Sequence, residues 1–316
     1  MTWNYFDAHC DTALEWWNQQ RHWDDAAFHV TRKRAKKLPY YAQFFAFCTV
    51  LQKTLPAEEQ FTRAAAYFAE ELARCEDLRL CGDPAEVLTA WEANKVGAVM
   101  ALEGAEAIGC DPGRLDEAVQ MGVRLITLTW NEANALGGSN LTGGGLTQQG
   151  RDFVRRCQKL GILVDISHVS DEVFYDVCEI AEKPIVASHS NCRAICGHPR
   201  NLTDDQFRCI VSLGGFAALN FYPEFLCEDG AASVDDLARH YEHFCDLGGE
   251  HAVAVGADWD GVESLPADIG GVDDAEKLFS ALASRGVPDK AICDLASETI
   301  LRVWQNAGAR PMKKAV

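Results

Sequence analysis

The sequence predicts an α/β protein folded as a single (β/α)₈ TIM barrel over residues 1–316. Short apolar runs rich in β-branched residues recur along the chain, and helical patterns separate most of them. Strands that alternate with helices indicate a parallel sheet, and eight strands are the number that closes this barrel. A chain of 316 residues is also a normal length for one such domain. The eight predicted strands are Tyr5–His9, Gln43–Leu51, Val96–Glu103, Val123–Thr129, Ile162–His168, Pro184–His189, Gly215–Phe221 and Ala252–Asp258.

Helical patterns fill most intervals between these strands and follow the last one. Ser170-Asp171 precedes one pattern and Thr203-Asp204 another, as N-capping chemistry prefers. The glycine-rich segment 137–145 follows the fourth strand, and we expect a βα loop there, either flexible or acting as a lid. The predicted helices are Ala57–Cys75, Arg114–Met121, Leu146–Leu160, Ser170–Ala181, Asp204–Leu213, Val234–Leu247, Asp273–Ser284 and Pro288–Gln305.

The composition argues against binding to nucleic acid or to anionic lipid, because the formal net charge is −18. The sequence contains no run of eighteen or more apolar residues, so it predicts no membrane span. The segment Met1–Asp11 lacks the basic and apolar regions of a secretory signal. The thirteen cysteines include no Cys-x-x-Cys pair, so we expect reduced thiols and a cytoplasmic protein.

The first predicted strand ends with a histidine and an aspartate two residues apart, His9 and Asp11. Side chains two apart on a strand point the same way, so these two share one face and Cys10 points to the other. An imidazole and a carboxylate so placed can converge on one cation. Taken alone, His-x-Asp is a weak motif, and a structural pair is the better explanation of it.

Comparable side chains end four other predicted strands, namely Glu103, His168, His189 and Asp258. In a barrel the carboxyl ends of all strands meet at one mouth, where the active sites of this fold lie. One polar residue at such a position means little. Five strands that each contribute a metal-ligand type are hard to explain by packing.

The predicted ligand set favours zinc. Imidazole and carboxylate ligands without thiolates suit Zn, Mn or Fe(II), and zinc is the default. A single catalytic zinc ion takes three protein ligands, whereas three histidines and three carboxylates converge here. Two ions that share a bridging carboxylate use the whole set, so we expect two zinc ions per chain.

Six segments resemble the membrane (renal) dipeptidase family of zinc metallopeptidases, within the amidohydrolase superfamily. The match runs from near Phe6 to about Gln305, nearly the whole chain. Its most specific parts are the SHS…PRN and GADWDG segments. The segments that carry the resemblance read DAHCDT, LEGAEAI, RLITLTWNEAN, DISHVSD, ASHSNCRAICGHPRNLTDDQ and GADWDGV.

The resemblance implies a binuclear-zinc dipeptidase, in which a metal-bridging hydroxide attacks the peptide bond of short dipeptides, including L,D-dipeptides. His9 and Asp11 are implied to bind one zinc ion. His168 and His189 are implied to bind the other, and Glu103 to bridge the two ions. Family habit also implies a homodimer.

Two further residues take their roles from the same resemblance. Asp258 is implied to contact the first metal and to relay the proton from the attacking water to the leaving amine, a general-base role that the chemistry supports. Arg200 is implied to hold the free carboxylate of the substrate, a contact that suits a guanidinium group. Without the resemblance, a loop salt bridge is the favoured explanation of Arg200.

The sequence departs from the family pattern after the fourth strand. The best-known members carry a histidine there that helps to polarise the scissile carbonyl, whereas this chain has Trp130 followed by Asn131. An indole offers only an N–H donor and does not titrate near neutral pH. Trp130 and Asn131 remain candidates for substrate binding.

Two other functions stay open on the sequence alone. The Trp130 replacement favours a metal-dependent hydrolase of another small amide or lactone, such as an N-acyl amino acid. A non-catalytic barrel is the third hypothesis, and the intact set of six ligands argues against it.

Several other polar residues receive structural interpretations. His240 and His243 are three apart on a predicted helix and we expect them at the surface or in an interface. Asp165 is expected to contact a loop or the helix layer. Asp260 is expected on the same face as Asp258, behind the metal ligands.

Overall fold

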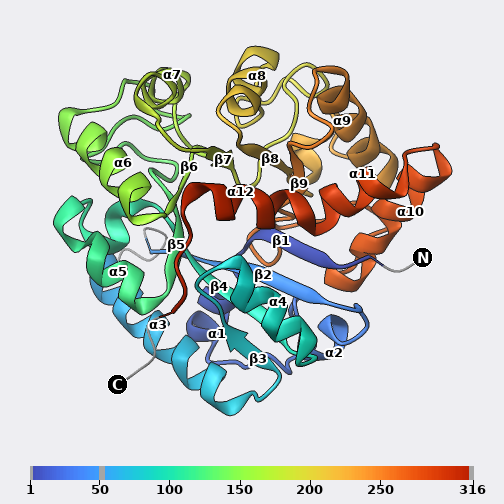
Figure 1. The fold of residues 1–316 in the computed structure, drawn as a ribbon, viewed down its shortest axis with the longest axis horizontal. Coiled ribbons are helices and arrows are strands. Elements are labelled where there is room, and N and C mark those ends of the chain that lie inside the picture. Colours follow the sequence, from blue (N-terminus) through green and yellow to red (C-terminus); the bar gives the residue numbers. More distant parts are fainter. Residues whose placement is uncertain (1–2, 50–53, 313–316) are drawn as a thin grey trace.

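Eight parallel strands close into a barrel in the computed structural model, which describes residues 3–49 and 54–312 (Figure 1). Each strand pairs in parallel with two neighbours, and the ring closes where β1 pairs with β9 and β2 pairs with β4. This confirms the predicted fold class. The barrel strands are β1 (Tyr5–Cys10), β2 (Tyr41–Cys48), β4 (Val96–Glu103), β5 (Val123–Thr127), β6 (Leu163–Asp165), β7 (Ile185–Ala187), β8 (Phe216–Leu219) and β9 (Val253–Val255).

One short strand lies outside the ring and was not predicted. β3 (Leu78–Leu80) pairs with the first residues of β4, on the side that β5 takes up further along. Three residues are too few to show a period in the sequence. The predicted strand Gln43–Leu51 begins two residues earlier, at Tyr41, and its last two residues lie outside the described part of the chain.

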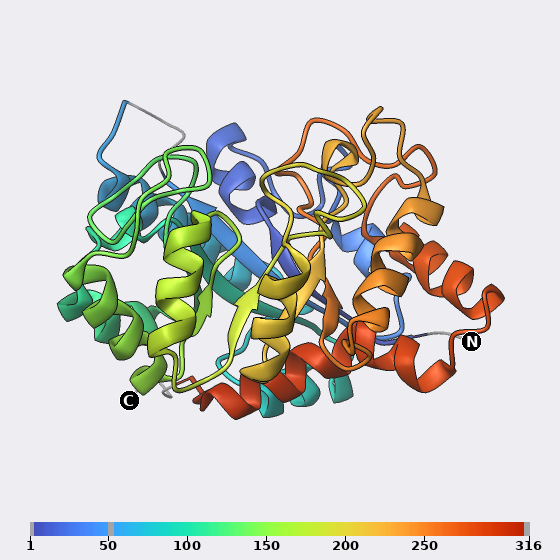
Figure 2. The same ribbon diagram turned by 90° about the horizontal axis from the view of Figure 1, so that it is seen from above.

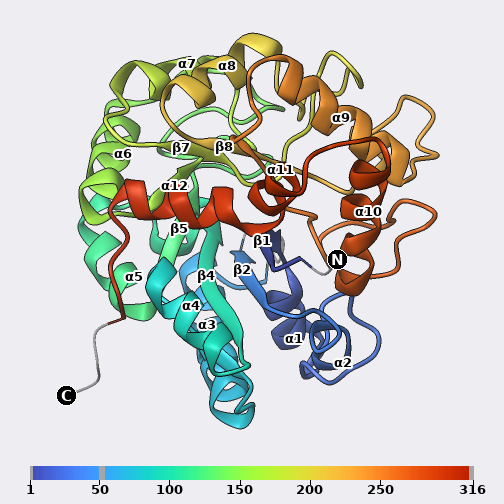
Figure 3. The same cartoon turned by 45° about the vertical axis from the view of Figure 1, so that its right-hand side comes forward.

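The interior of the barrel is an apolar core sealed by the C-terminal helix, α12 (Thr299–Ala307). Phe6 and Phe44 stack inside the ring at 5.3 Å, and Trp304 meets both rings edge-on from α12. Figure 2 shows α12 across one end of the barrel and the loops gathered at the other. α12 and α4 both lie at the sealed end in the turned view (Figure 3). The open end is therefore the one where side chains are free to form a site.

A second apolar core fills the space between the strands and the outer helices. Alternating strand residues supply it: in β2, Phe45 and Phe47 pack in this outer core while Phe44 and Ala46 face the barrel interior. Cys10 also packs in the outer core. The remaining helices are α1 (Thr12–Gln19), α2 (Arg32–Ala35), α3 (Ala57–Arg74), α4 (Pro84–Glu92), α5 (Leu115–Met121), α6 (Gln148–Leu160), α7 (Asp171–Ile180), α8 (Asp204–Ser212), α9 (Val234–Asp246), α10 (Glu276–Ser284) and α11 (Asp289–Cys293).

The predicted helices are present, with two kinds of difference. α1 and α4 were not among the predicted helices; both are short, and α1 begins two residues after β1 ends. The long helix predicted over Pro288–Gln305 is divided into α11, a π-helical turn at Asp294–Glu298 and α12. The helical pattern of the sequence continues through Asp294, so the division was not predicted. In the structure the carboxylate of Asp294 is buried against His251 and Lys290. Throughout the described residues, no helix is both long enough and apolar enough to cross a bilayer.

Candidate metal centre and active site

The six predicted metal ligands all lie at the open end of the barrel, although only two of them are within strands. His9 is in β1 and Glu103 ends β4. The strands predicted to end at His168, His189 and Asp258 instead end two or three residues earlier, so these side chains lie in loops.

Buried carboxylates end those strands early. Asp165 Oδ1 accepts hydrogen bonds from the backbone N–H groups of Ser167 and Ser188. Asp7 Oδ2 accepts one from Ala257 N–H. Once these amides donate to side chains, they no longer join the ladder between strands. These hydrogen bonds fix the positions of the loops that carry His168, His189 and Asp258 relative to the barrel.

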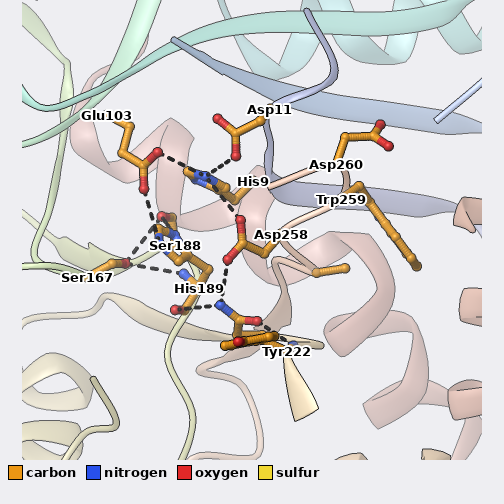
Figure 4. Close-up of polar contacts among 12 residues, drawn as sticks. His9, Asp11, Glu103, Ser167, Ser188, His189, Tyr222, Asp258, Trp259 and Asp260 are labelled. Carbon is orange, nitrogen blue, oxygen red and sulfur yellow. Dashed lines mark hydrogen bonds and ion pairs between the residues drawn. The ribbon is translucent and has the colours of Figure 1, made fainter. Parts of the chain in front are cut away.

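Five of these side chains form two overlapping groups that share His9, namely His9, Glu103 and His189, and His9, Asp11 and Asp258 (Figure 4), and His168 contacts the first group through Glu103 and His189. His9 Nε2 lies 3.7 Å from Asp11 Oδ2 and 3.7 Å from Asp258 Oδ1. Glu103 joins the groups, because its Oε2 is 3.8 Å from His9 Nε2.

His168 and His189 lie on the other side of Glu103. The Oε1 atom of Glu103 is 2.9 Å from His168 Nε2 and 3.5 Å from His189 Nε2. The two Nε2 atoms are themselves only 2.9 Å apart. All six residues are at most 9% exposed. The predicted shared face of His9 and Asp11 is confirmed by their contact.

Burial and mutual charge set the pKa values around His9. Burial by itself lowers the pKa of His9, but Glu103, Asp11 and Asp258 outweigh it and raise that pKa to about 10. Burial also opposes ionisation of Glu103, yet His9 and His168 hold its pKa down at about 2. Burial and the charge on Glu103 raise the pKa of Asp11 to about 7. The three neighbouring carboxyl groups of Asp11, Glu103 and Asp258 therefore need positive charge nearby if all three are to be ionised.

The other two histidines are neutral. Burial, together with the charge of Arg200, lowers the pKa of His168 to about 4. Burial and the charge on His9 lower the pKa of His189 well below its ordinary value. Neutral imidazoles beside an ionised carboxylate are the form in which these groups bind a metal.

Several buried polar atoms in this cluster fit a pair of cations. Neither ring nitrogen of His9 has a hydrogen-bond partner among the described residues, and the same holds for Asp11 Oδ1. His168 and His189 bring two Nε2 atoms to hydrogen-bond distance, and a neutral imidazole that donates through Nδ1 carries only a lone pair there. Nitrogen and oxygen donors without sulfur suit zinc and its borderline relatives.

A cavity of about 600 Å³ opens to the surface from four of the six residues, Asp11, Glu103, His168 and Asp258. Trp130, Asn131 and Arg200, the three predicted substrate-binding residues, all line it. Asn131 has a second contact, because its Oδ1 lies 3.1 Å from His168 Nδ1. Trp130 lies beside the same histidine, with ring centroids 6.3 Å apart.

Arg200 has no acidic partner within ion-pair distance among the described residues, although it is only 6% exposed. Its NH1 lies 3.4 Å from Ser190 Oγ, and its guanidinium group lies 5.6 Å from the ring centre of Phe225. Burial lowers its pKa to about 10, which still leaves it charged at neutral pH. The loop salt bridge considered for Arg200 is absent from the described residues, and a buried cation that faces a cavity is suited to an anionic ligand.

Sequence reasoning missed three buried or cavity-lining residues, Asp7, Asn220 and Tyr222. Asp7 accepts hydrogen bonds from His9 N–H and from Trp259 Nε1–H, and burial raises its pKa to about 6. Asn220 Nδ2 donates to Asp258 Oδ2 at 2.9 Å. Tyr222 lines the cavity, and burial with Glu263 nearby raises its pKa to about 12. Asp165, which was expected to contact a loop or the helix layer, is fully buried and accepts hydrogen bonds from the loop residues Ser167 and Ser188. A charged residue inside an apolar strand is the signal that points to Asp7 and Asp165.

Two structural interpretations need correction. His240, expected at the surface or in an interface, is fully buried and accepts a hydrogen bond from Cys192 N–H. Asp260 does not share the face of Asp258, and it points away from His9 (Figure 4) toward Thr12 and His29. The period-two rule fails there because the strand has already ended at Val255.

Comparisons with known proteins agree with this geometry. Residues 2–315 match the family model described as membrane dipeptidase, peptidase family M19. An uncharacterised protein from the pqqA 5′ region of Klebsiella pneumoniae is 35% identical over 241 residues, which cover 72% of this chain and 89% of that protein. An uncharacterised dipeptidase of Schizosaccharomyces pombe is 31% identical over 218 residues, or 67% of this chain and 53% of that protein.

Two solved structures are similar over almost the whole chain. The structure of dipeptidase AC, described as a metallopeptidase of family M19, has a TM-score of 0.89 at 29% identity and covers 97% of this chain and 99% of its own. A metallopeptidase from Rhodobacter sphaeroides, liganded with a phosphinate mimic of the dipeptide L-Ala-D-Ala, has a TM-score of 0.86 at 29% identity and covers 97% and 100%.

Proposed function

The chain belongs to the membrane dipeptidase family, peptidase family M19, and we propose that it acts as a binuclear zinc dipeptidase whose substrates include L,D-dipeptides. The single observation that supports this most strongly is the convergence of three histidines and three carboxylates beside one cavity, which four of them line. The ligand of the Rhodobacter relative, a mimic of L-Ala-D-Ala, supports a substrate of mixed stereochemistry.

In this proposal His9 and Asp11 hold one zinc ion, His168 and His189 hold the other, and Glu103 lies between them with one oxygen toward each group. When bound, a pair of zinc ions polarises the scissile carbonyl and supplies a nucleophile derived from water at neutral pH. The donor geometry favours this arrangement because each carboxylate oxygen of Glu103 faces a different histidine.

Asp258 is the proposed proton carrier. Its carboxylate faces the cavity, with Oδ1 on the side of His9 and Oδ2 held by the amide group of Asn220. Burial raises its pKa, which brings it closer to the range where a carboxyl group both accepts and returns a proton. We assign to it the uptake of a proton from the attacking water and its delivery to the leaving amine.

Arg200 is proposed to bind the free carboxylate of the substrate. It faces the same cavity from the loop after β7 and keeps its charge without a protein counter-ion among the described residues. Trp130 and Asn131 line the wall next to His168, where Trp130 offers an apolar surface and one N–H donor to the substrate.

The experiment that tests this function combines metal quantification with a substrate panel on one purified sample. We expect about two zinc ions per chain, as the two-metal mechanism requires, and turnover of L,L- or L,D-dipeptides. A zinc-loaded protein that turns over no member of the panel contradicts the dipeptidase assignment.

A second candidate keeps the metals and changes the bond that is cleaved. Trp130 stands where the best-known family members have a histidine, and this favours a hydrolase of N-acyl amino acids or of another small amide or lactone. Activity on N-acyl amino acids, without activity on dipeptides, selects it. The cytoplasmic location and the homodimer stay predictions.

A further inference from the structure

A hydrogen-bonded chain of three buried residues lies behind His189. Ser188 Oγ is 2.6 Å from Asp165 Oδ2 and 2.7 Å from His189 Nδ1. The three residues are at most 1% exposed, so water does not compete for these contacts. Figure 4 shows Ser188 beside His189 at the floor of the site.

The direction of hydrogen bonding along this chain follows from Asp165. Its carboxylate accepts from the hydroxyl groups of Thr127, Ser167 and Ser188, and from two backbone N–H groups. An ionised carboxylate only accepts hydrogen bonds, so the single hydroxyl proton of Ser188 is committed to Asp165. Ser188 Oγ then has only lone pairs to offer to His189. The ring must therefore donate through Nδ1–H.

This direction determines which nitrogen of His189 faces the active site as a lone pair. A neutral imidazole that carries its proton on Nδ1 has an unprotonated Nε2. That Nε2 lies 3.5 Å from Glu103 Oε1 and 2.9 Å from His168 Nε2. His168 is held in the same sense, since its Nδ1 lies 3.1 Å from Asn131 Oδ1.

We propose that Asp165 and Ser188 are positioning residues that set the Nδ1–H tautomer of His189 through a carboxylate–hydroxyl–imidazole relay, and so keep Nε2 available to a metal ion. The inference rests on the proposed metal site. Groups that hold the outer nitrogen of a ligating histidine commonly change metal affinity by about 10- to 100-fold when they are removed.

The same contacts also tie β5, β6 and β7 together, so a purely structural role must be distinguished. Ser167 offers a matched control. Its hydroxyl donates to the same carboxylate at 2.7 Å and is buried to a similar degree, but it contacts the backbone N–H of His189 rather than the ring. Loss of either hydroxyl group removes a hydrogen bond to Asp165, whereas only loss of the Ser188 hydroxyl group removes the partner of His189 Nδ1.

The first experiment measures zinc affinity by chelator competition for the parent, Ser188→Ala and Ser167→Ala. We expect Ser188→Ala to weaken zinc binding at the site proposed for His168 and His189 by about 10- to 100-fold and Ser167→Ala to change it by less than about 3-fold. Equal losses of zinc affinity in the two variants overturn the relay and indicate that the hydroxyl groups have a purely structural role. A parent that binds no zinc contradicts the proposed function instead, and the two failures are therefore distinct.

The second experiment reads the tautomer directly, from imidazole ¹⁵N chemical shifts in the metal-free protein. We expect Nδ1–H for His189 in the parent. Asp165→Asn keeps the side-chain volume but supplies an N–H donor toward Ser188, whose hydroxyl then donates to His189 Nδ1 and drives the proton to Nε2. An Nε2–H ring in the parent, or an unchanged tautomer in Asp165→Asn, overturns the proposal.

Folding of each variant is checked by near-UV circular dichroism. If Asp165→Asn does not fold, the tautomer in Ser188→Ala decides. That variant leaves Asp165 with the hydroxyl groups of Thr127 and Ser167 and with both backbone donors. A mixture of tautomers in Ser188→Ala supports the relay, and a ring that remains wholly Nδ1–H contradicts it.

Discussion

The backbone at Asp258 is left-handed, with φ 65°, and this conformation directs its carboxylate toward His9. Asparagine and aspartate tolerate this region better than other residues with a β-carbon. Asp258→Asn therefore keeps the loop conformation and the volume while it removes the proton acceptor. We expect bound zinc to be retained and kcat to fall by a factor of about 10² or more, measured by metal analysis and steady-state kinetics.

Asp260→Asn is the matched control for that variant. Asp260 has a similar backbone, φ 63°, but its carboxylate bonds Thr12 and two backbone N–H groups instead of facing His9. The kcat of Asp260→Asn should stay within a few-fold of the parent value. Equal activity of Asp258→Asn and the parent removes Asp258 from the mechanism.

Arg200 gives a prediction about substrate charge. Arg200→Ala removes the buried guanidinium group that lines the cavity, so binding of dipeptides with a free carboxylate should weaken, with KM raised by about 10-fold or more since charge-assisted contacts are worth roughly 1.5–3 kcal/mol. Dipeptide amides lack that carboxylate and serve as the internal control. A similar rise in KM for the amides contradicts the assigned role.

At the scale of elements, Ser170 joins a helix to the glycine-rich loop. Its Oγ accepts from Val173 N–H at the start of α7 and donates to the carbonyl oxygen of Gly144. The loop reaches the cavity wall, where Ser139 Oγ donates to the Asn131 carbonyl oxygen. We expect Ser170→Ala to lower the free energy of unfolding by about 1–2 kcal/mol in urea denaturation, the usual cost of a lost N-cap.

Thr203→Ala is the control for the loop. Thr203 caps α8 in the same way but does not contact segment 137–145. Both variants should lose similar stability, whereas limited proteolysis within the loop should accelerate only in Ser170→Ala. Equal cleavage rates show that the cap does not anchor the loop.

The boundaries of the elements show where sequence reasoning stops. All eight barrel strands were predicted from apolar runs, because burial on both faces leaves a continuous apolar signal. Their ends were placed two or three residues too late at β5, β6, β7, β8 and β9. The apolar pattern continues through Ile166 and Ala257, while buried carboxylates have already taken the backbone N–H groups. That competition is a tertiary contact, so the pattern alone does not reveal it.

At the scale of the whole molecule, His240 makes stability depend on pH. Its Nδ1 accepts from Cys192 N–H and its Nε2 donates to the carbonyl oxygen of Leu226, so the native state requires the neutral ring. Burial lowers its pKa to about 4. As pH falls below about 6.5, the unfolded state binds a proton that the native state does not accept until about pH 4.

His240 therefore contributes stability that is fully present above about pH 6.5 and is lost as pH falls toward 4, about 2 kcal/mol of it by pH 5. His240→Asn supplies a neutral acceptor that does not titrate. Urea denaturation at pH 7 and pH 5 should show a smaller loss in this variant than in the parent. An identical loss in both removes His240 as the cause.

The fold of this protein and most residues of its candidate site could be predicted from the sequence. Eight apolar runs separated by helices determine a closed parallel barrel, because that number of strands fits the ring. Ligand-type residues at or just past the ends of those runs must then meet at one mouth, which is why the gathering of His9, Glu103 and His189 could be expected. The extent of one domain, residues 1–316, stays a prediction.

Only the tertiary structure decided how those residues are held. Asp165 is distant in the chain from Thr127 and Ser188, yet closure of the barrel brings both to its carboxylate. It likewise places Asn220 against Asp258 and buries His240 under Cys192. A sequence period reports which way a side chain points from its own strand. The partner that fixes its proton, charge or rotamer comes from another strand, and proximity between strands exists only after folding.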